Sequence, residues 1–473
     1  MKKSSLIDTT RQYDAFTANG AVTHSTTLSA CVDLFFIAGA SRNLPADTLC
    51  QMFQAAFNES PTIAMRILFW ARDCRGGAGE KYFFRTIARY LRSNYPNIWT
   101  KVRYLTPDFG SWKDIFEIDI PSENNLIFLV HALEYHSQAN LLAKWFPRKG
   151  KWFVNMHRFA DKTPGELRKY LVAKSNTVEQ LMCSQKFSEI EYSKVPSVAM
   201  NRYRTAFGKR DAIRFGEFIT AALKGEVKIN ANVLFPHQLY TAIIAEQDEQ
   251  AVEAQWRALP DYMTNSEERI IPVCDVSGSM TDNNGLPMSV SVSLGLYISE
   301  RNKGIFKDAF ITFSTHPQME YVKGNTLAER MRSISTAGWG YNTNLTAVFK
   351  LILTSATRES IPENEMPTKV LIISDMEFDI ATDANHHTNL DVIKAAYAEA
   401  GYKMPEIIFW NVNGSAHNFP AKANEPGIGL VSGFSPAILQ AILKGQVLSP
   451  ADLMLTAIAA ERYNSVEKAL HDD

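Results

Sequence analysis

The feature that most constrains the fold of this chain is a change in hydrophobic pattern near residues 261–268. Before this segment, apolar residues recur at the three- and four-residue spacing of amphipathic helices. After it, short apolar runs alternate with helical patterns, which is typical of a parallel sheet covered by helices on both faces. The pattern therefore predicts a multidomain α plus α/β protein whose C-terminal part is a doubly wound sheet.

Three segments follow from this pattern: a helical domain over 1–265, an α/β domain over 266–447 and a C-terminal helical tail over 448–473. In the α/β segment we expect strands near 269–275, 308–314, 318–322, 368–375, 405–412 and 428–432. The first segment contains successive short amphipathic helices, which predict an α-solenoid of HEAT-like repeats; the alternative is an irregular helical domain.

The composition fits globular domains of this kind. A chain of 473 residues with 46% hydrophobic and 21% charged residues is long enough for two or three domains with large cores. No apolar run is long enough to span a bilayer, and the polar sequence after Met1 shows no secretory signal. Five scattered cysteines favour reduced thiols, without a disulfide framework or zinc motif. We therefore expect a cytoplasmic protein that does not contact membranes.

The run from Ile271 to Met280 carries the most specific chemistry. It is an apolar strand that stops at Asp275-Val276-Ser277-Gly278-Ser279, so that one carboxylate and two hydroxyls alternate along a tight loop. Hard oxygen ligands of this type suit Mg²⁺ or Mn²⁺. A single carboxylate leaves the cation electrophilic enough to accept an acidic oxygen from a partner.

Two further segments contribute oxygen ligands. The loop Gly340–Asn344 supplies Thr343 just before a helical stretch, and a second apolar strand, Val370–Ser374, is followed by Asp375. In an open parallel sheet, ligands collect beyond the carboxyl ends of the strands, where both aspartates stand. Taken singly, each segment is explained by a helix cap or a turn; together, in this order, they predict a metal site. A phosphatase-type aspartyl nucleophile is less favoured, because Ser277 occupies the place of its second carboxylate.

Charge is distributed unevenly along a chain of net charge −1. Residues 66–214 hold 26 basic and 14 acidic residues, whereas residues 269–473 hold 16 and 22. A basic helical surface suits a polyphosphate ligand such as RNA; the alternative is that these charges are simply solvated.

Three segments supply candidate RNA contacts. Residues 144–153 interleave four cations with four aromatic rings, a pattern that can contact phosphates and stack on unpaired bases, although the rings can equally be packing residues. Residues 72–81 form a glycine-rich basic turn that lacks the ending of a P-loop; alternatively it is a plain helix–helix turn in which Arg72 pairs with Asp73 or Glu80. Cations flank the link at residues 192–200, which alternatively only sets a helix start. The candidates are Arg72, Arg75, Lys81, Lys144, Trp145, Arg148, Lys149, Lys151, Arg202 and Arg204.

The order strand–Asp-x-Ser-x-Ser, loop–Thr–helix, strand–Asp resembles the metal-ion-dependent adhesion site of von Willebrand factor A domains. The resemblance implies a Rossmann-like fold with Mg²⁺ or Mn²⁺. It also implies the ligands: Asp275, Ser277 and Ser279 directly, Thr343 directly or through water, and Asp375 mostly through water.

The whole chain is similar to the Ro ribonucleoprotein (TROVE-module) family, and closer to an uncharacterised relative of it in plants, fungi and phages. The segments that carry the similarity are 19–26, 72–80, 192–200, 234–237 and 432–435. The resemblance implies helical repeats arranged in a ring, with single-stranded RNA ends in its hole and structured small RNA on its basic outer face.

We find no constellation of residues typical of an enzyme. The expected function is an RNA-binding ribonucleoprotein-type scaffold, with RNA on the helical domain and an Mg²⁺-dependent acidic ligand or protein partner on the A domain. The alternative is a metal-dependent adaptor without RNA, of the kind that works beside AAA+ (MoxR-type) ATPases. A metal-dependent hydrolase ranks third.

Overall fold

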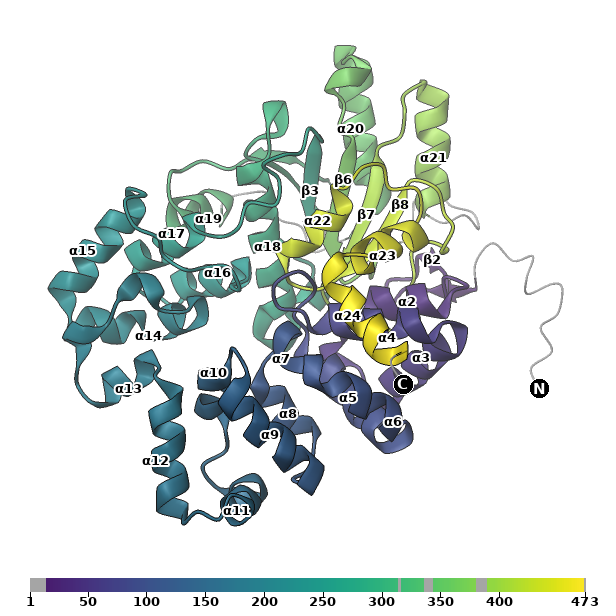
Figure 1. Cartoon of the computed structure of the whole chain (residues 1–473). Helices are drawn as coiled ribbons and strands as arrows, with labels where there is room; N and C mark the ends of the chain where they lie inside the picture. Colours follow the sequence, from purple (N-terminus) through teal and green to yellow (C-terminus); the bar gives the residue numbers. More distant parts are fainter. Residues whose placement is uncertain (1–13, 314–315, 336–342, 380–388, 472–473) are drawn as a thin grey trace.

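The computed structural model describes residues 14–313, 316–335, 343–379 and 389–471. An N-terminal helical region is followed by a C-terminal region with a mixed sheet (Figure 1). The prediction of a multidomain α plus α/β protein is therefore confirmed. In the described residues, none of the helices combines the length and the apolar character needed to cross a membrane.

The sheet has six strands in the order β5-β4-β3-β6-β7-β8. Their bounds are β3 Ile270–Cys274, β4 Ala309–Thr312, β5 Met319–Tyr321, β6 Lys369–Ser374, β7 Glu406–Asn411 and β8 Ile428–Ser432. All six match predicted strands. Residues of β3, β6 and β8 are buried throughout, as expected for strands covered on both faces.

The expectation of a wholly parallel sheet is wrong at one edge. Five strands are parallel, but β5 pairs antiparallel with β4, with Ile311 opposite Met319. The connection from Thr312 to Met319 is too short for a crossover helix, so the chain returns as a hairpin.

Helices from both ends of the chain pack on this sheet. Helix α18 (Asp282–Arg301) contacts β3, β4 and β6, and α20 (Leu345–Glu359) packs against α21 (Asn389–Ala400). Strand β8 is covered by α23 (Pro450–Ile458) and also by α2 (Ala30–Ala38) from the start of the chain. The remaining helices of this region are α19 (Leu327–Ser335), α22 (Leu439–Ile442) and α24 (Asn464–His471).

The helical region forms an arch with both ends attached to the sheet region (Figure 1). Its first helices pack beside α23 and α24, and its last two pack on α18 and α19. After α2 its helices are α3 (Ala46–Glu59), α4 (Pro61–Arg72), α5 (Lys81–Asn94), α6 (Pro96–Val102), α7 (Thr106–Phe109), α8 (Trp112–Ile118), α9 (Glu123–Tyr135), α10 (Ala139–Trp145), α11 (Gly150–Phe159), α12 (Pro164–Ser175), α13 (Val178–Cys183), α14 (Ser197–Arg210), α15 (Ala212–Leu223), α16 (Pro236–Ile244) and α17 (Glu249–Arg257). Apart from the single turn α7, the sequence pattern missed two of these helices, α11 and α17.

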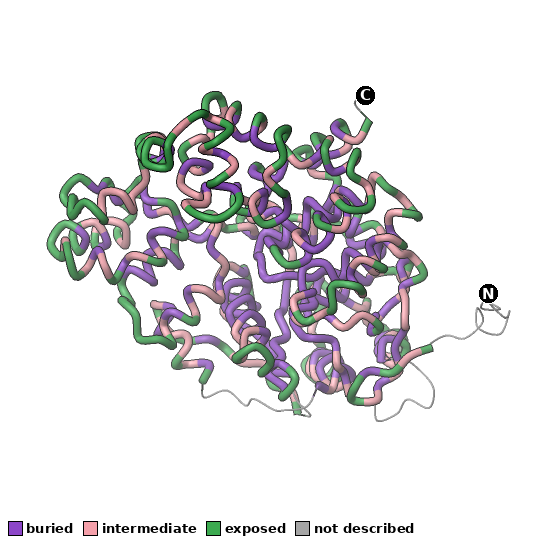
Figure 2. Tube along the Cα trace, turned by 90° about the horizontal axis from the view of Figure 1, so that it is seen from below, coloured by how far each residue is buried: buried purple, intermediate pink, exposed green. Residues whose placement is uncertain are grey.

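The hydrophobic core does not divide at residue 265. One continuous core joins both regions, from Phe35 and Trp70 in the first helices to Phe409 in the sheet and Tyr463 in the tail. Two smaller cores, around Leu142 and around Phe207, lie within the arch. Figure 2 shows the same division, with buried residues gathered in the centre and exposed ones along the outer helices. The predicted boundary at residue 265 therefore divides the sequence, but the helical region and the sheet region share one hydrophobic core.

Candidate functional site

The site lies where the strand order of the sheet reverses. From β3 the chain proceeds to β4 and β5 on one side, then crosses to β6, β7 and β8 on the other. Ligands of open α/β sheets bind in the crevice that this reversal creates at the carboxyl ends of the strands. Asp275 follows β3 and Asp375 follows its neighbour β6, so the structure places both aspartates at this crevice.

Asp275 is fully buried, and its carboxylate is fixed by hydrogen bonds. The Ser277 backbone N–H donates to Oδ1 at 2.8 Å, and the Ser374 hydroxyl donates to Oδ2 at 2.5 Å. The backbone is held as well, because the Asp275 N–H donates to the Ser291 hydroxyl at 3.0 Å. The carboxylate therefore has one defined orientation at the end of β3.

Three more residues join Asp275. The hydroxyl oxygens of Ser277 and Ser279 lie 3.1 Å apart. Ser279 also hydrogen-bonds the Asp375 carboxylate, which opposes the rise in the pKa of Asp375 caused by burial. The Glu377 N–H donates to Asp375 Oδ1 at 3.2 Å. Direct contacts thus gather four of the five predicted metal ligands, and Ser279, being exposed, opens the cluster to solvent.

The electrostatics of this cluster favour a bound cation. Burial raises the pKa of Asp275 to about 6, and the negative charge of Asp375 adds to the rise. Two buried carboxylates in mutual repulsion are stabilised when a positive charge lies between them. The donor set of carboxylate and hydroxyl oxygens suits Mg²⁺ or Mn²⁺. In the part of the chain that the structure describes, no group of three or more His, Cys, Asp or Glu side chains is placed to hold a metal ion; this cluster has two carboxylates, and its other oxygen atoms are hydroxyls.

Thr343 lies just before α20 and contacts the loop that follows β6. Its N–H donates to Asp379 Oδ2 at 2.8 Å, and its hydroxyl donates to the Glu377 carbonyl at 2.7 Å. The structure therefore joins Thr343 to the loop of Asp375, and its hydroxyl oxygen accepts a hydrogen bond from the Asn19 side chain at 3.4 Å. Residues 340–342 of the predicted loop lie outside the described residues.

The sequence pattern missed the N-terminal hairpin of β1 (Ala15–Phe16) and β2 (Val22–Thr23), which packs on this same loop. The Thr17 hydroxyl donates to the Phe378 carbonyl at 2.7 Å. The Asn19 side-chain amide donates to the Glu377 carbonyl at 2.7 Å and to Thr343 Oγ1 at 3.4 Å. Only the segment 19–26, noted for its resemblance, hinted at this region. Ser374 was also missed, because a single serine in an apolar strand gives no distinct signal.

Two predicted RNA contacts are wrong, because their side chains are buried. Arg72 is 2% exposed and pairs with Asp114 at 2.7 Å, so the predicted alternatives Asp73 and Glu80 are not its partners either. Arg204 is also 2% exposed and hydrogen-bonds Asn201 and Gln247. Neither guanidinium is available to a nucleic acid.

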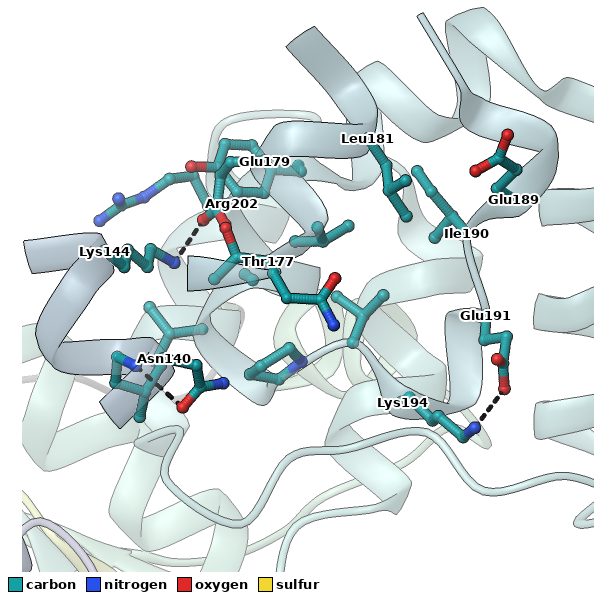
Figure 3. Close-up of a pocket in the computed structure, with 18 of the residues that line it drawn as sticks. Asn140, Lys144, Thr177, Glu179, Leu181, Glu189, Ile190, Glu191, Lys194 and Arg202 are labelled. Atoms are coloured by element: carbon teal, nitrogen blue, oxygen red, sulfur yellow. Dashed lines mark hydrogen bonds and ion pairs between the residues drawn. The ribbon is translucent and has the colours of Figure 1, made fainter. Parts of the chain in front are cut away.

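The other candidates remain at the surface. Arg75, Lys81, Lys149, Lys151 and Arg202 are exposed, and Lys144, Trp145 and Arg148 are partly exposed. Lys144 and Trp145 of α10 line one cavity together with Arg202 of α14. Figure 3 shows Lys144 and Arg202 in this cavity. For the buried rings Phe146, Trp152 and Phe153, the alternative interpretation as packing residues is confirmed.

Comparison with known proteins finds similarity without a described function. The family described as "Domain of unknown function (DUF2828)" matches residues 17–125 and 156–268, and "Domain of unknown function (DUF7788)" matches residues 269–471. "Uncharacterized protein L728" of Acanthamoeba polyphaga mimivirus is 28% identical over an alignment that covers 96% of this chain and 88% of that protein. The two family matches meet at residues 268 and 269, next to the change in hydrophobic pattern, and the alignment with the viral protein extends across both.

Proposed function

We propose that this protein is a non-enzymatic binding scaffold with two ligand surfaces. Its α/β region is a von Willebrand factor A domain that uses a divalent cation to bind an acidic group of a protein partner. Its helical region is a TROVE-like repeat array that binds RNA. The observation that carries the proposal is the cluster of Asp275, Ser277, Ser279 and Asp375 at the reversal of the strand order.

The residues present fit Mg²⁺ or Mn²⁺. Asp275, Ser277 and Ser279 would hold the cation directly, with Asp375 and Thr343 acting through water or at longer range. When bound, the cation supplies a positive centre that accepts an oxygen from the partner's carboxylate. The chain keeps the net charge at the site low by using neutral hydroxyls, and Ser374 and the Ser277 N–H hold the Asp275 carboxylate in place.

Metal binding is the primary test. Isothermal titration of the full chain with MgCl₂ should show one site, and Asp275→Ala should abolish it. Asp282→Ala is the matched control, because Asp282 is an exposed carboxylate at the start of α18, three residues after Ser279. An unchanged Mg²⁺ isotherm in Asp275→Ala would remove the basis of the proposal.

RNA binding by the helical region is supported by the excess of basic residues over 66–214 and by the exposed cations near α11. Phosphate contacts release counterions, so retention of RNA should weaken steeply as salt increases. Charge reversal of Lys149 and Lys151 should lower RNA affinity, whereas reversal of the exposed Lys307 and Lys323 on the sheet region should not. Equal losses in both variants would argue against a specific surface.

A second candidate, an adaptor without RNA, is favoured by a specific observation. Some cations of the helical region are already paired: Lys144 with Glu179 at 2.6 Å, and Lys194 with Glu191 at 2.7 Å. In this reading the helical region docks another protein, such as an AAA+ (MoxR-type) ATPase. Recovery of no RNA above background after crosslinking in the native host would favour the adaptor.

A further inference from the structure

The chain contains three Asn-Gly pairs: Asn19-Gly20, Asn284-Gly285 and Asn413-Gly414. An Asn-Gly pair is prone to spontaneous deamidation, because glycine has no side chain to hinder the attack of its backbone nitrogen on the asparagine amide. All three pairs belong to the carboxyl edge of the sheet. Asn19 hydrogen-bonds Thr343, Asn413 follows β7, and Asn284 comes five residues after Ser279. Their surroundings differ, and this difference decides which pair can react.

The pair Asn19-Gly20 is held by hydrogen bonds at both reacting groups. The Gly20 N–H donates to the Thr17 carbonyl at 2.9 Å. The Asn19 side-chain amide donates to the Glu377 carbonyl at 2.7 Å and to Thr343 Oγ1 at 3.4 Å. Because the attacking nitrogen and the leaving amide are both engaged, these bonds must break before the pair can react.

The pair Asn413-Gly414 is held between other segments of the chain. The Gly414 N–H donates to the Ala40 carbonyl at 2.9 Å, and a Cβ on Gly414 would lie 3.2 Å from the same oxygen. The Asn413 side chain accepts a hydrogen bond from Asn43 at 2.8 Å and donates one to Asp282 Oδ2 at 3.4 Å. Rotation of this turn would therefore break several contacts at once.

The pair Asn284-Gly285 stands in the open, on the turn at the start of α18. Asn284 is exposed, and among the described residues its side chain has no hydrogen-bond partner. In the same part of the chain, the Gly285 N–H has no partner outside its own turn. A Cβ on Gly285 would meet no atom within 4 Å. This pair therefore lacks the contacts that hold the other two.

The backbone of this turn is also strained. Asn283, Asn284 and Gly285 are all left-handed, with φ of 51°, 59° and 72°. Single Asn or Gly residues adopt this conformation readily, but consecutive ones are unfavourable. At ψ 38° the Gly285 nitrogen points away from the Asn284 side chain, so the turn must rotate before it reacts. The strain lowers the free energy of that opening, which one exposed hydrogen bond, from Asn283 to Asn43 at 2.7 Å, opposes.

We propose that Asn284 is a site of spontaneous deamidation, and that the fold protects Asn19 and Asn413 from the same reaction. The Gly285 nitrogen attacks Asn284 Cγ and forms an N–Cγ bond. The side-chain nitrogen leaves as ammonia and takes the proton of the Gly285 amide. Water then cleaves either C–N bond of the succinimide ring, which gives aspartate or isoaspartate. Each product carries a negative charge that asparagine lacks.

Mass spectrometry of tryptic peptides tests the proposal, because Lys and Arg residues separate the three pairs into different peptides. The folded full chain is incubated at mildly alkaline pH in water enriched in oxygen-18, which labels each carboxylate formed before digestion. Asn284 should convert at least about tenfold faster than Asn19 or Asn413, because the protected pairs must first break their hydrogen bonds.

The same incubation in urea is the matched control, because it removes the fold and leaves the sequence. All three pairs should then convert at rates within about threefold of one another. In the folded chain, Asn284→Gln should remove the label from its peptide and Asn283→Gln should not. Equal rates at the three pairs of the folded chain would overturn the proposal, as would an Asn284 that converts only in urea.

One consequence rests on the metal function proposed above. A carboxylate in place of the Asn284 amide should attract the cation, so Asn284→Asp should tighten Mg²⁺ binding by about twofold at low salt and by less at high salt. Calorimetry with MgCl₂ measures this, and an unchanged affinity at low salt would overturn the consequence. Absence of Mg²⁺ binding in wild type would count against the metal site alone, since the deamidation is measured without metal.

Discussion

Two regions of this molecule bury charged side chains. They differ in what offsets the free-energy cost of removing those charges from water. In the helical region, buried Asp114 is paired with Arg72 at 2.7 Å and with Arg85 at 2.8 Å. At the carboxyl edge of the sheet, buried Asp275 and Asp375 have only hydroxyl and N–H donors; among the described residues they form no ion pair. A buried charge with its counter-charge supports the fold, whereas two buried like charges without one favour the binding of a cation, as proposed above.

The glycine-rich turn at residues 72–81, a candidate RNA contact by its sequence, belongs to the first of these two regions. The glycine-rich turn after Arg72 joins the two halves of the protein. Asp73 pairs with Arg462 at 2.7 Å, and Gly79, at φ +72°, lies where a Cβ would collide with the Phe235 ring. A Cβ on Gly77 would lie 2.0 Å from the Trp70 carbonyl oxygen. The turn therefore needs glycine for close packing at a junction, and nothing in it requires a ligand.

The largest expected effect comes from breaking the balanced pair. Asp114→Ala leaves two cations, Arg72 and Arg85, without their carboxylate in the interior. We expect a loss of about 3–5 kcal/mol in the free energy of unfolding. Urea denaturation measures it, with the exposed Asp108→Ala as the control. A loss below about 1 kcal/mol would mean that the cluster is far better solvated than its burial indicates.

Addition of the proposed cation is the second test. Mg²⁺ at about 100 times its dissociation constant should stabilise the native state by about 2.7 kcal/mol, because the cation binds the folded chain alone. Differential scanning calorimetry with MgCl₂ or EDTA should show this as a higher melting temperature in wild type. The same shift in Asp275→Ala would place the bound ion elsewhere.

Removal of one of the two like charges should increase the free energy of unfolding, whereas Asp114→Ala should decrease it. Asp375→Asn keeps an acceptor oxygen for the Glu377 N–H but removes the charge that raises the pKa of Asp275. In EDTA this variant should be more stable than wild type by about 1–2 kcal/mol, and it should gain less from Mg²⁺. Urea midpoints in EDTA measure the first effect. If Asp375→Asn is less stable than wild type in EDTA, repulsion between the two carboxylates is not the main contribution to stability at this end of the sheet.

The parts of this structure that follow from local pattern were predictable. Apolar runs located all six strands of the main sheet, and the alternation of Asp275, Ser277 and Ser279 located one half of the candidate site, because both depend on residues close together in sequence. Asp375 was located by its position directly after a second apolar strand. The burial of Arg72 was not predictable, because its partner Asp114 lies 42 residues away and a charged residue is ordinarily exposed.

Two helices escaped the pattern for other reasons. Helix α11 starts at Gly150 with φ +77°, just after the turn at Pro147, so its beginning resembles a loop. Helix α17 is amphipathic but has only nine residues and a polar composition, so its apolar face was passed over. In both cases the local signal is present but short.

The smallest predicted effect concerns the least local contact at the metal edge. Asn19 hydrogen-bonds the Glu377 carbonyl and Thr343 Oγ1, although it lies more than 300 residues from both. Because it positions Thr343 without being a metal ligand, Asn19→Ala should weaken Mg²⁺ binding by about fivefold, equivalent to one hydrogen bond of about 1 kcal/mol. Calorimetry with MgCl₂ measures this change, and the exposed Asn94→Ala in α5 is the control. An unchanged affinity would show that the hairpin only covers the loop, and the contrast between the two charged regions would then rest on the carboxylate pair alone.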